Sequence, residues 1–123
     1  MDFASHLLAH YSSDFVDKLL GSLQGEPTHC LVLNTNKMRD QELLERVPSL
    51  SPHPFIPHAY FYFKKEWEAG KSLFYDLGCF SIQDASAMMV PYFLKPRPGE
   101  TVLDFCAAPG GKTIFMSLGM EQN

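Results

Sequence analysis

The segment from Asp104 to Thr113 combines an acidic residue, a turn of small residues and a lysine in an order that suits cofactor binding. Asp104 lies near the end of a short apolar run, and the turn Cys106-Ala107-Ala108-Pro109-Gly110-Gly111 follows it. Alanines keep bulky side chains away, glycines permit positive φ, and the first NH groups of a helix are free to bind an anion. This order predicts the first βα unit of a nucleotide-cofactor sheet.

Two kinds of cofactor compete for such a turn. Gly111-Lys112-Thr113 matches the second half of the phosphate-binding loop G-x-x-x-x-G-K-[ST]. The first glycine of that loop would fall on position 106, where Cys106 puts a side chain at a place that needs a tight backbone. This difference favours S-adenosylmethionine over a nucleoside triphosphate.

The elements that precede this segment predict a small αβ subdomain. Apolar spacing predicts two helices within residues 3–23, with a cap at residues 12–14 between them. A short β-favouring run predicts a strand over residues 28–34, and a leucine stripe predicts a helix over residues 40–47. After several prolines, residues 59–63 predict a strand that is aromatic on both faces.

A second group of elements leads to the turn. We expect a helix from Asp84 to Leu94 that Pro91 kinks or ends early, then a proline–glycine turn, a strand over residues 101–105 and a helix from Lys112. The expected fold class is α/β. Residues 1–75 would form the N-terminal subdomain, and residues 76–123 would begin a Rossmann-like domain.

The totals exclude several classes of protein. The 123 residues carry a net charge of −4, so bulk positive charge does not hold the chain on nucleic acid, and any RNA contact must be local. The longest apolar run, Met88 to Leu94, is far shorter than the roughly 20 residues of a membrane span. The start of the chain has no basic signal region, and the three cysteines lack C-x-x-C spacing. We therefore expect that the chain neither spans a membrane nor holds a zinc site or a disulfide framework. Its cysteines are expected to be free thiols in a reducing cytoplasm.

Three segments carry patterns that occur together in one enzyme family. The turn segment Asp104–Thr113 matches a first cofactor motif, and Gly78–Ser86 matches G-x-x-x-x-Q-[DE]-x-[SA]. Leu33–Lys37 is similar to V-N-T-L-K, although Asn36 replaces its leucine and Val32 stands where arginine is frequent. With these motifs the chain resembles the Nop/Sun (RsmB/RsmF-like) family of RNA cytosine-C5 methyltransferases.

The resemblance implies a cofactor, a reaction and a set of binding residues. The reaction is methyl transfer from S-adenosylmethionine to C5 of cytosine in RNA, with ribosomal RNA as the expected substrate and a small N-terminal RNA-binding subdomain. The turn would hold the methionine end of the cofactor, with Asp104 near its amino group. The implied cofactor-binding residues are Asp104, Cys106, Ala107, Ala108, Pro109, Gly110, Gly111 and Lys112.

The resemblance also indicates that the chain lacks its own catalytic residues. The reaction needs a cysteine thiolate that adds to C6 of cytosine, which the family carries in a Thr-Cys-Ser segment. Neither Thr-Cys-Ser nor a Pro-Cys dipeptide, which would carry the family's second cysteine for product release, occurs here. Asn123 ends the chain before a second strand whose acid would bind the cofactor ribose. We expect a truncated, inactive chain. A non-catalytic RNA-binding module, and one half of a split enzyme with a complementary C-terminal half, stay open as alternatives.

Several suggestive residues also have plainer explanations. Cys106 is expected to be a small buried packing residue rather than a nucleophile. The aromatic run 60–63 favours a buried strand over a platform that stacks bases. His53 and His58 have no recognisable ligand set around them, so no metal site is predicted. Gln83 and Asp84 are expected both to cap the following helix and to lie at the site.

Overall fold

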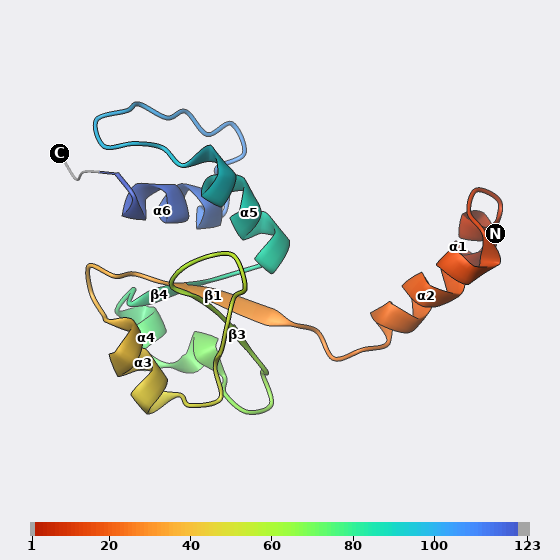
Figure 1. The fold of residues 1–123 in the computed structure, drawn as a ribbon, viewed down its shortest axis with the longest axis horizontal. Coiled ribbons are helices and arrows are strands. Elements are labelled where there is room, and N and C mark those ends of the chain that lie inside the picture. The colour runs from red at the N-terminus through yellow and green to blue at the C-terminus, as the bar shows by residue number, and fades with distance from the viewer. Residues whose placement is uncertain (1, 121–123) are drawn as a thin grey trace.

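A four-stranded antiparallel sheet forms the middle layer of the computed structural model, which describes residues 2–120 (Figure 1). The strand order is β2-β3-β1-β4, with β1 at His29–Leu33, β2 at Ser51–Pro52, β3 at Ala59–Tyr62 and β4 at Phe80–Gln83. Within β1, Leu31 lies opposite Tyr60 of β3 on one side and Ile82 of β4 on the other. The strands predicted around residues 28–34 and 59–63 are confirmed.

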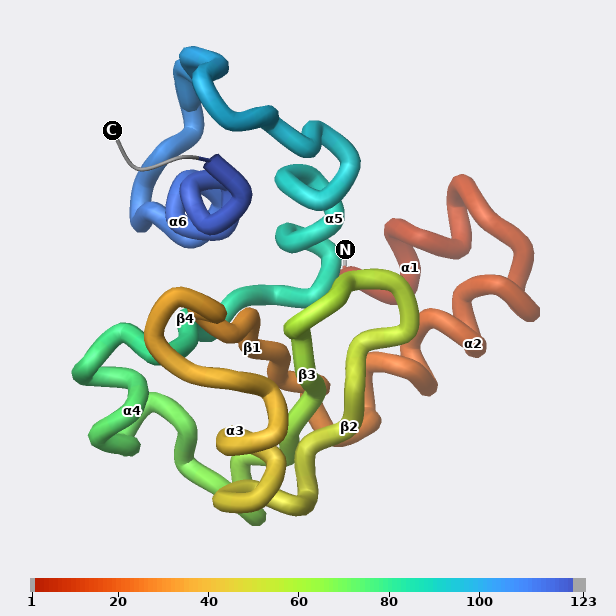
Figure 2. Tube along the Cα trace, turned by 60° about the vertical axis from the view of Figure 1, so that its left-hand side comes forward, coloured from red at the N-terminus to blue at the C-terminus, as the bar shows by residue number. Residues whose placement is uncertain are grey.

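Each face of the sheet is covered by its own helical layer. Figures 1 and 2 show α5 (Ala85–Leu94) and α6 (Gly111–Leu118) on one face, and α3 (Asp40–Arg46) and α4 (Leu73–Asp76) on the other, where a short 3-10 turn, η1 (Ala69–Lys71), also packs. Successive side chains of a strand point to opposite faces. Leu31 and Leu33 therefore pack on the α3 side, while Cys30 and Val32 pack on the α5 side.

The first two helices form a hairpin that projects from this body (Figure 1). They are α1 (Phe3–Leu8), capped by Asp2, and α2 (Ser13–Leu23), capped by Ser12. Both helices and the cap between them are as predicted. Val16 is the one residue of the hairpin that is buried in the part of the chain the structure describes, at 1% exposure.

The strand predicted at residues 101–105 is not formed, and that prediction is wrong. Residues 101–104 have no regular structure and Phe105 lies in a turn; Leu103 is 75% exposed and Phe105 is 92% exposed. A strand needs a neighbour to satisfy its NH and CO groups. Within residues 2–120 the sheet is built from β1 to β4, and none of these strands pairs with residues 101–105. The helix that follows, α6, does form.

Two further features of this half of the chain refine the predicted layout. Helix α5 runs through the buried Pro91 to Leu94, so the proline does not end it early. Strand β4 belongs to the predicted second part, residues 76–123, but pairs with β1 of the predicted first part in one sheet. The division of the chain near residue 75 stays a prediction.

The α/β fold class is confirmed.

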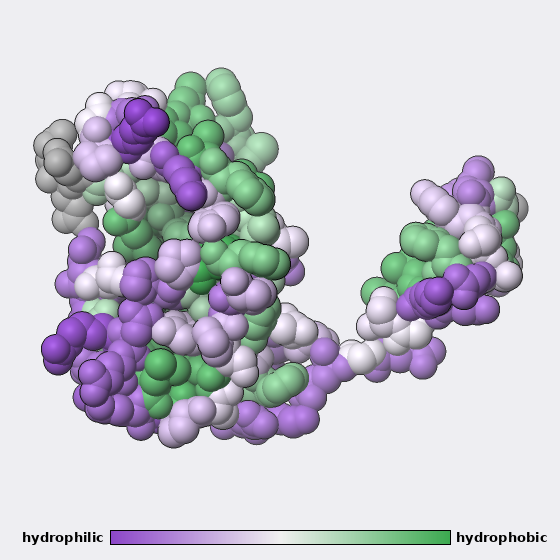
Figure 3. Space-filling view, in the orientation of Figure 1, coloured by the Kyte–Doolittle hydropathy of each residue, from purple (hydrophilic) through white to green (hydrophobic). Residues whose placement is uncertain are grey.

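Exposed apolar side chains gather over α5 and the loop that follows it. Figure 3 shows a hydrophobic region on the upper right of the body, where Figure 1 places these segments. The most exposed of these side chains belong to Phe93, Leu103 and Phe105. The loop that leads to the turn is therefore held by few apolar contacts.

Candidate functional site

The turn before α6 leaves the start of that helix without a side-chain cap. Gly110 is the N-cap residue, and its φ of 108° lies in the region that favours glycine. Because Gly110 has no side chain, no side-chain oxygen caps the first NH groups of α6. These groups have no partner inside a helix, and the helix dipole favours an anion beside them. The start of α6 is therefore suited to a carboxylate or a phosphate.

Asp104 ties the two sides of the turn together. One carboxylate oxygen accepts a hydrogen bond from the backbone NH of Cys106 at 2.8 Å, and the other accepts one from the hydroxyl of Thr113 at 2.7 Å. The hydrogen bond from Thr113, followed by that from Cys106, lowers the pKa of Asp104, and the positive charge of Lys112 adds to this effect. Asp104 is thus an anion at neutral pH.

A cavity of about 210 Å³ lies between the turn and the start of α5. Most of the predicted binding residues border it, together with residues of the β4–α5 junction. Its lining consists of Ile82, Gln83, Asp84, Ala87, Cys106, Ala107, Ala108, Pro109, Gly111 and Lys112. The structure therefore brings two segments that are separate in sequence to one cavity.

Two predicted residues lie beside this cavity rather than in its wall. Asp104 borders a neighbouring cavity of about 250 Å³, which it shares with Ala107 and Thr113. Ala107 borders both cavities. Gly110, between the lining residues Pro109 and Gly111, is the N-cap of α6. The predicted residues therefore border two cavities.

Gln83 and Asp84 play different parts at the β4–α5 junction. Asp84 caps α5 by accepting hydrogen bonds from the backbone NH groups of Ser86 at 2.8 Å and Ala87 at 3.2 Å. The hydroxyl of Ser86 also donates to this carboxylate, and that bond is the first cause of the lowered pKa of Asp84. Gln83 is only 8% exposed and instead reaches across to the turn, where its side-chain NH donates to the carbonyl of Gly111 at 2.7 Å. Asp84 caps α5 as predicted, whereas Gln83 does not, because its side chain binds Gly111 instead. The contact from Gln83 to Gly111 was not predicted.

Comparison with known proteins finds RNA methyltransferases that are similar to this chain. Residues 91–123 match the model of a family described as 16S rRNA methyltransferase RsmB/F. A tRNA (cytosine(49)-C(5))-methyltransferase from Pyrococcus abyssi is 39% identical over 90 residues, which is 72% of this chain and 29% of that protein. The resemblance to the Nop/Sun methyltransferases is confirmed. The chain spans less than a third of the length of this relative.

Further relatives agree with this result. A probable ribosomal RNA small subunit methyltransferase B from Synechocystis is 58% identical over 40 residues, covering 32% of this chain and 9% of that protein. The solved structure of a methyltransferase homologue from Pyrococcus horikoshii has a TM-score of 0.71 at 26% identity and covers 94% of this chain and 43% of its own. A second solved chain, at 23% identity and a TM-score of 0.73, supports the same fold.

Lys112 places a positive charge at the N-terminal end of α6, where the helix dipole is unfavourable to it. It is half-buried in the first turn of α6, where the helix dipole disfavours a cation. It also borders the cavity and lies close enough to Asp104 to lower the pKa of that carboxyl. A bound anion would remove the conflict between Lys112 and the helix dipole. This is the same role that the resemblance to the Nop/Sun family implies for the turn.

Cys106 is exposed rather than buried, which corrects the expectation that it packs inside a strand–turn corner. The reason is that residues 101–105 form no strand and pack against no second layer, so the corner stays open to solvent. Cys30 and Cys79 are both buried, and burial raises the pKa of the Cys30 thiol to about 11. The thiolate is the reactive form of cysteine.

These differences predict that iodoacetamide labels one of the three cysteines in the folded chain. At pH 8 we expect a single adduct on Cys106 by intact mass and peptide mapping, with labelling of Cys30 and Cys79 at least about tenfold slower. In urea all three should react, which is the control. Labelling of Cys30 or Cys79 at the rate of Cys106 in the folded chain would contradict the burial that the structure gives them.

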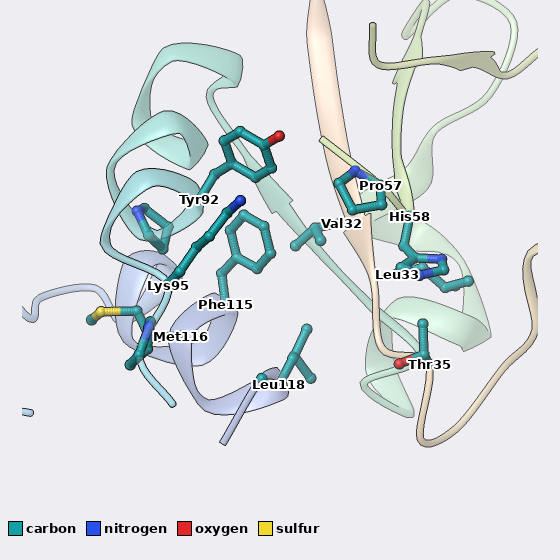
Figure 4. Close-up of a pocket in the computed structure, with 13 residues that line it drawn as sticks. Val32, Leu33, Thr35, Pro57, His58, Tyr92, Lys95, Phe115, Met116 and Leu118 are labelled. Atoms are coloured by element: carbon teal, nitrogen blue, oxygen red, sulfur yellow. The ribbon is translucent and has the colours of Figure 1, made fainter. Parts of the chain in front are cut away.

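A larger cavity, of about 530 Å³, lies away from the turn (Figure 4). Figure 4 shows it between the end of β1, the loop at Pro57 and His58, and the helices α5 and α6, with Tyr92 and Phe115 on the helix side and Val32 facing them. None of the predicted binding residues borders this cavity. Its walls are mostly apolar, and Leu33 and Thr35 of the segment similar to V-N-T-L-K are among them. Because the predicted cofactor-binding residues gather at the turn, the smaller cavity there is the stronger candidate for the cofactor.

The histidine and aromatic residues have structural contacts. His58 and Tyr60 both bind the carboxylate of Asp40, His58 at 2.7 Å, and this ties the loop before β3 to the start of α3. Tyr60 and Tyr62 are buried, as predicted for a packed strand, while Phe63 is 42% exposed.

Within residues 2–120 no group of three or more metal-ligating side chains gathers. In the same range no helix is long and apolar enough to cross a membrane.

Proposed function

We propose that this chain is part of an enzyme that transfers a methyl group from S-adenosylmethionine to C5 of a cytosine in RNA, and that the turn at residues 104–112 holds the amino-acid end of the methyl donor. One observation carries the proposal. The two segments that resemble Nop/Sun motifs, around Gln83 and around Gly110, border a single cavity although they are apart in the sequence. This is the arrangement expected of a binding site, because residues of separate segments converge on one volume.

The charges around the turn fit the amino-acid end of S-adenosylmethionine. Its carboxylate matches the uncapped NH groups at the start of α6 and the cation of Lys112. Its ammonium matches the ionised Asp104, whose oxygens keep free lone pairs beside the two hydrogen bonds that they already accept. We assign cofactor-binding roles to Asp104, Cys106, Ala107, Ala108, Pro109, Gly110, Gly111 and Lys112. The donor, when bound, supplies the electrophilic methyl group.

The names of the relatives support a proposal for the substrate. Those that match are named for ribosomal RNA and for transfer RNA, and we propose ribosomal RNA because the matching family model is that of a 16S rRNA methyltransferase. A cytoplasmic location belongs to the same proposal. We assign the attacking thiolate to none of the three cysteines, because Cys30 and Cys79 are buried and Cys106 forms part of the cofactor turn.

Binding of the methyl donor is the first test. S-adenosylmethionine should give calorimetric heat with the chain and should slow the alkylation of Cys106, because this thiol borders the cavity. ATP at the same concentration is the control and should do neither. Protection by ATP without protection by S-adenosylmethionine would reverse the choice of cofactor, and protection by neither would leave the chain as the RNA-binding module considered as an alternative.

Methyl transfer is the second test. A chimera in which this chain replaces the matching segment of the Pyrococcus abyssi relative should incorporate radiolabelled methyl groups from S-adenosylmethionine into RNA. Asp104→Asn in the chimera should raise the KM for the methyl donor about tenfold, because it replaces the anion proposed to meet the ammonium. A fully active chimera whose KM for the donor is unchanged by Asp104→Asn would contradict the role given to this carboxylate.

A further inference from the structure

Gln83 occupies a junction of three elements. It is the last residue of β4, it precedes the residue that caps α5, and its side chain reaches the first residue of α6. The hydrogen bond from its side-chain NH to the carbonyl of Gly111 spans 28 positions of the chain. Through β4, which pairs with β1, Gln83 is part of the antiparallel sheet. It therefore joins the sheet directly to the start of the cofactor turn's helix.

Burial makes a glutamine at this place unusual. The residue is 8% exposed, and its side-chain carbonyl oxygen has no hydrogen-bond partner among residues 2–120. A buried amide with an unused acceptor costs free energy that an apolar side chain of similar volume would not. Packing alone does not account for the choice of glutamine. The hydrogen bond to Gly111 does, because only a donor can hold that carbonyl.

The absence of a side chain at Gly111 allows Gln83 to approach this closely. A Cβ added at Gly111 would lie 3.2 Å from the side-chain carbon of the Gln83 amide and 3.3 Å from its oxygen. Both distances are closer than ordinary van der Waals contact between carbon and neighbouring heavy atoms. The second glycine of the turn thus serves the close approach of Gln83, whereas the first, Gly110, serves the positive φ.

Phe115 of α6 packs against the core cluster that contains Met88, but none of residues 101–111 in the turn and the loop before it is buried, so the turn has few other fixed points. Residues 101–103 and 105–109 are exposed, and among residues 2–120 Asp104 binds only groups of the turn and of α6. We propose that Gln83 is a positioning residue, which fixes the first turn of α6 against the end of β4 so that its free NH groups face the cavity. This inference rests on the function proposed above, and it deepens that function by naming what sets the geometry of the site.

Gln83→Met is the direct test, because methionine keeps most of the volume and removes the hydrogen bond. The concentration of S-adenosylmethionine that half-protects Cys106 should rise about tenfold, since one buried hydrogen bond is worth about that factor. Gly111→Ala should do the same from the opposite side of the contact. Ser81→Ala is the matched control: it removes the weaker partner of Gln83, at 3.3 Å, and should leave the half-protecting concentration within twofold.

The double variant Gln83→Met/Gly111→Ala distinguishes a shared contact from two separate effects. If both residues act through one contact, the double variant should be about as weak as either single variant. Effects that multiply to about a hundredfold would overturn the proposal. A nuclear magnetic resonance signature separates positioning from general loss of structure: the side-chain NH signals of Gln83 should exchange slowly in the wild-type chain and quickly in Gly111→Ala.

A failure of the proposed function would look different. If S-adenosylmethionine does not protect Cys106 in the wild-type chain, the cofactor assignment fails while the positioning role is still decided by alkylation without any ligand. Gln83→Met and Gly111→Ala should then each speed the alkylation of Cys106 about threefold, because the turn is released from β4. Unchanged rates in both variants, or slow exchange of the Gln83 NH signals in Gly111→Ala, would overturn the positioning role.

Discussion

Replacing Leu31 with alanine should lower the free energy of unfolding by about 2–5 kcal/mol, the range observed when a buried leucine leaves a cavity. Leu31 has no exposed surface, and it lies in the central strand of the sheet between Tyr60 and Ile82. Its side chain packs in the same core as Leu43 of α3. Since β1 connects both neighbouring strands, the core around Leu31 has little freedom to collapse around the missing atoms.

Urea unfolding followed by circular dichroism measures this loss, with Leu23→Ala as the control. Leu23 is also a leucine in a regular element but is 65% exposed, so its replacement should change the free energy of unfolding by less than about 0.5 kcal/mol. Equal losses for the two variants would show that the sheet does not form the stable core described here. A loss below about 1 kcal/mol for Leu31→Ala would have the same meaning.

Local patterns in the sequence predict the elements that form the core. The leucine stripe of α3 and the short apolar or aromatic runs of β1 and β3 are visible over a few positions, and those elements lie where they are predicted. The strands β2 and β4 depend on partners far away in the chain, and β2 has only two residues. The run 101–105 has the composition of a strand but no partner within residues 2–120. Pairing, and not propensity, decides these cases.

The candidate site follows the same division. The types of residue in the turn predict its glycine cap and the helix after it, because positive φ and free NH groups are local properties. The contact from Gln83 to Gly111 is not local, and sequence spacing contains no sign of it. The exposure of Cys106 was missed for the related reason that burial depends on a second layer of structure. The resemblance to the Nop/Sun family pointed to Gln83 but not to what it touches.

Gly110→Val should weaken the binding of S-adenosylmethionine about tenfold to a hundredfold while changing the free energy of unfolding by less than about 1 kcal/mol. A β-branched residue at a φ of 108° is strained by about 1–3 kcal/mol. The added Cβ would meet only the end of Ile114, at 3.7 Å, so the cause is backbone strain and not a clash. Because the turn is mostly exposed, it can relax and release the strain, and its NH groups then lose their common direction.

The half-protecting concentration of S-adenosylmethionine and the urea midpoint, measured on the same sample, check this prediction. Gly119→Val is the control, since Gly119 ends the same helix at a φ of −93° that valine adopts without strain, and its nearest neighbour is 3.7 Å away. The control should keep its affinity for the donor within twofold. A Gly110→Val chain that loses 1–3 kcal/mol of stability but binds the donor normally would mean that the strained turn is held rigid and that its NH groups do not bind the donor.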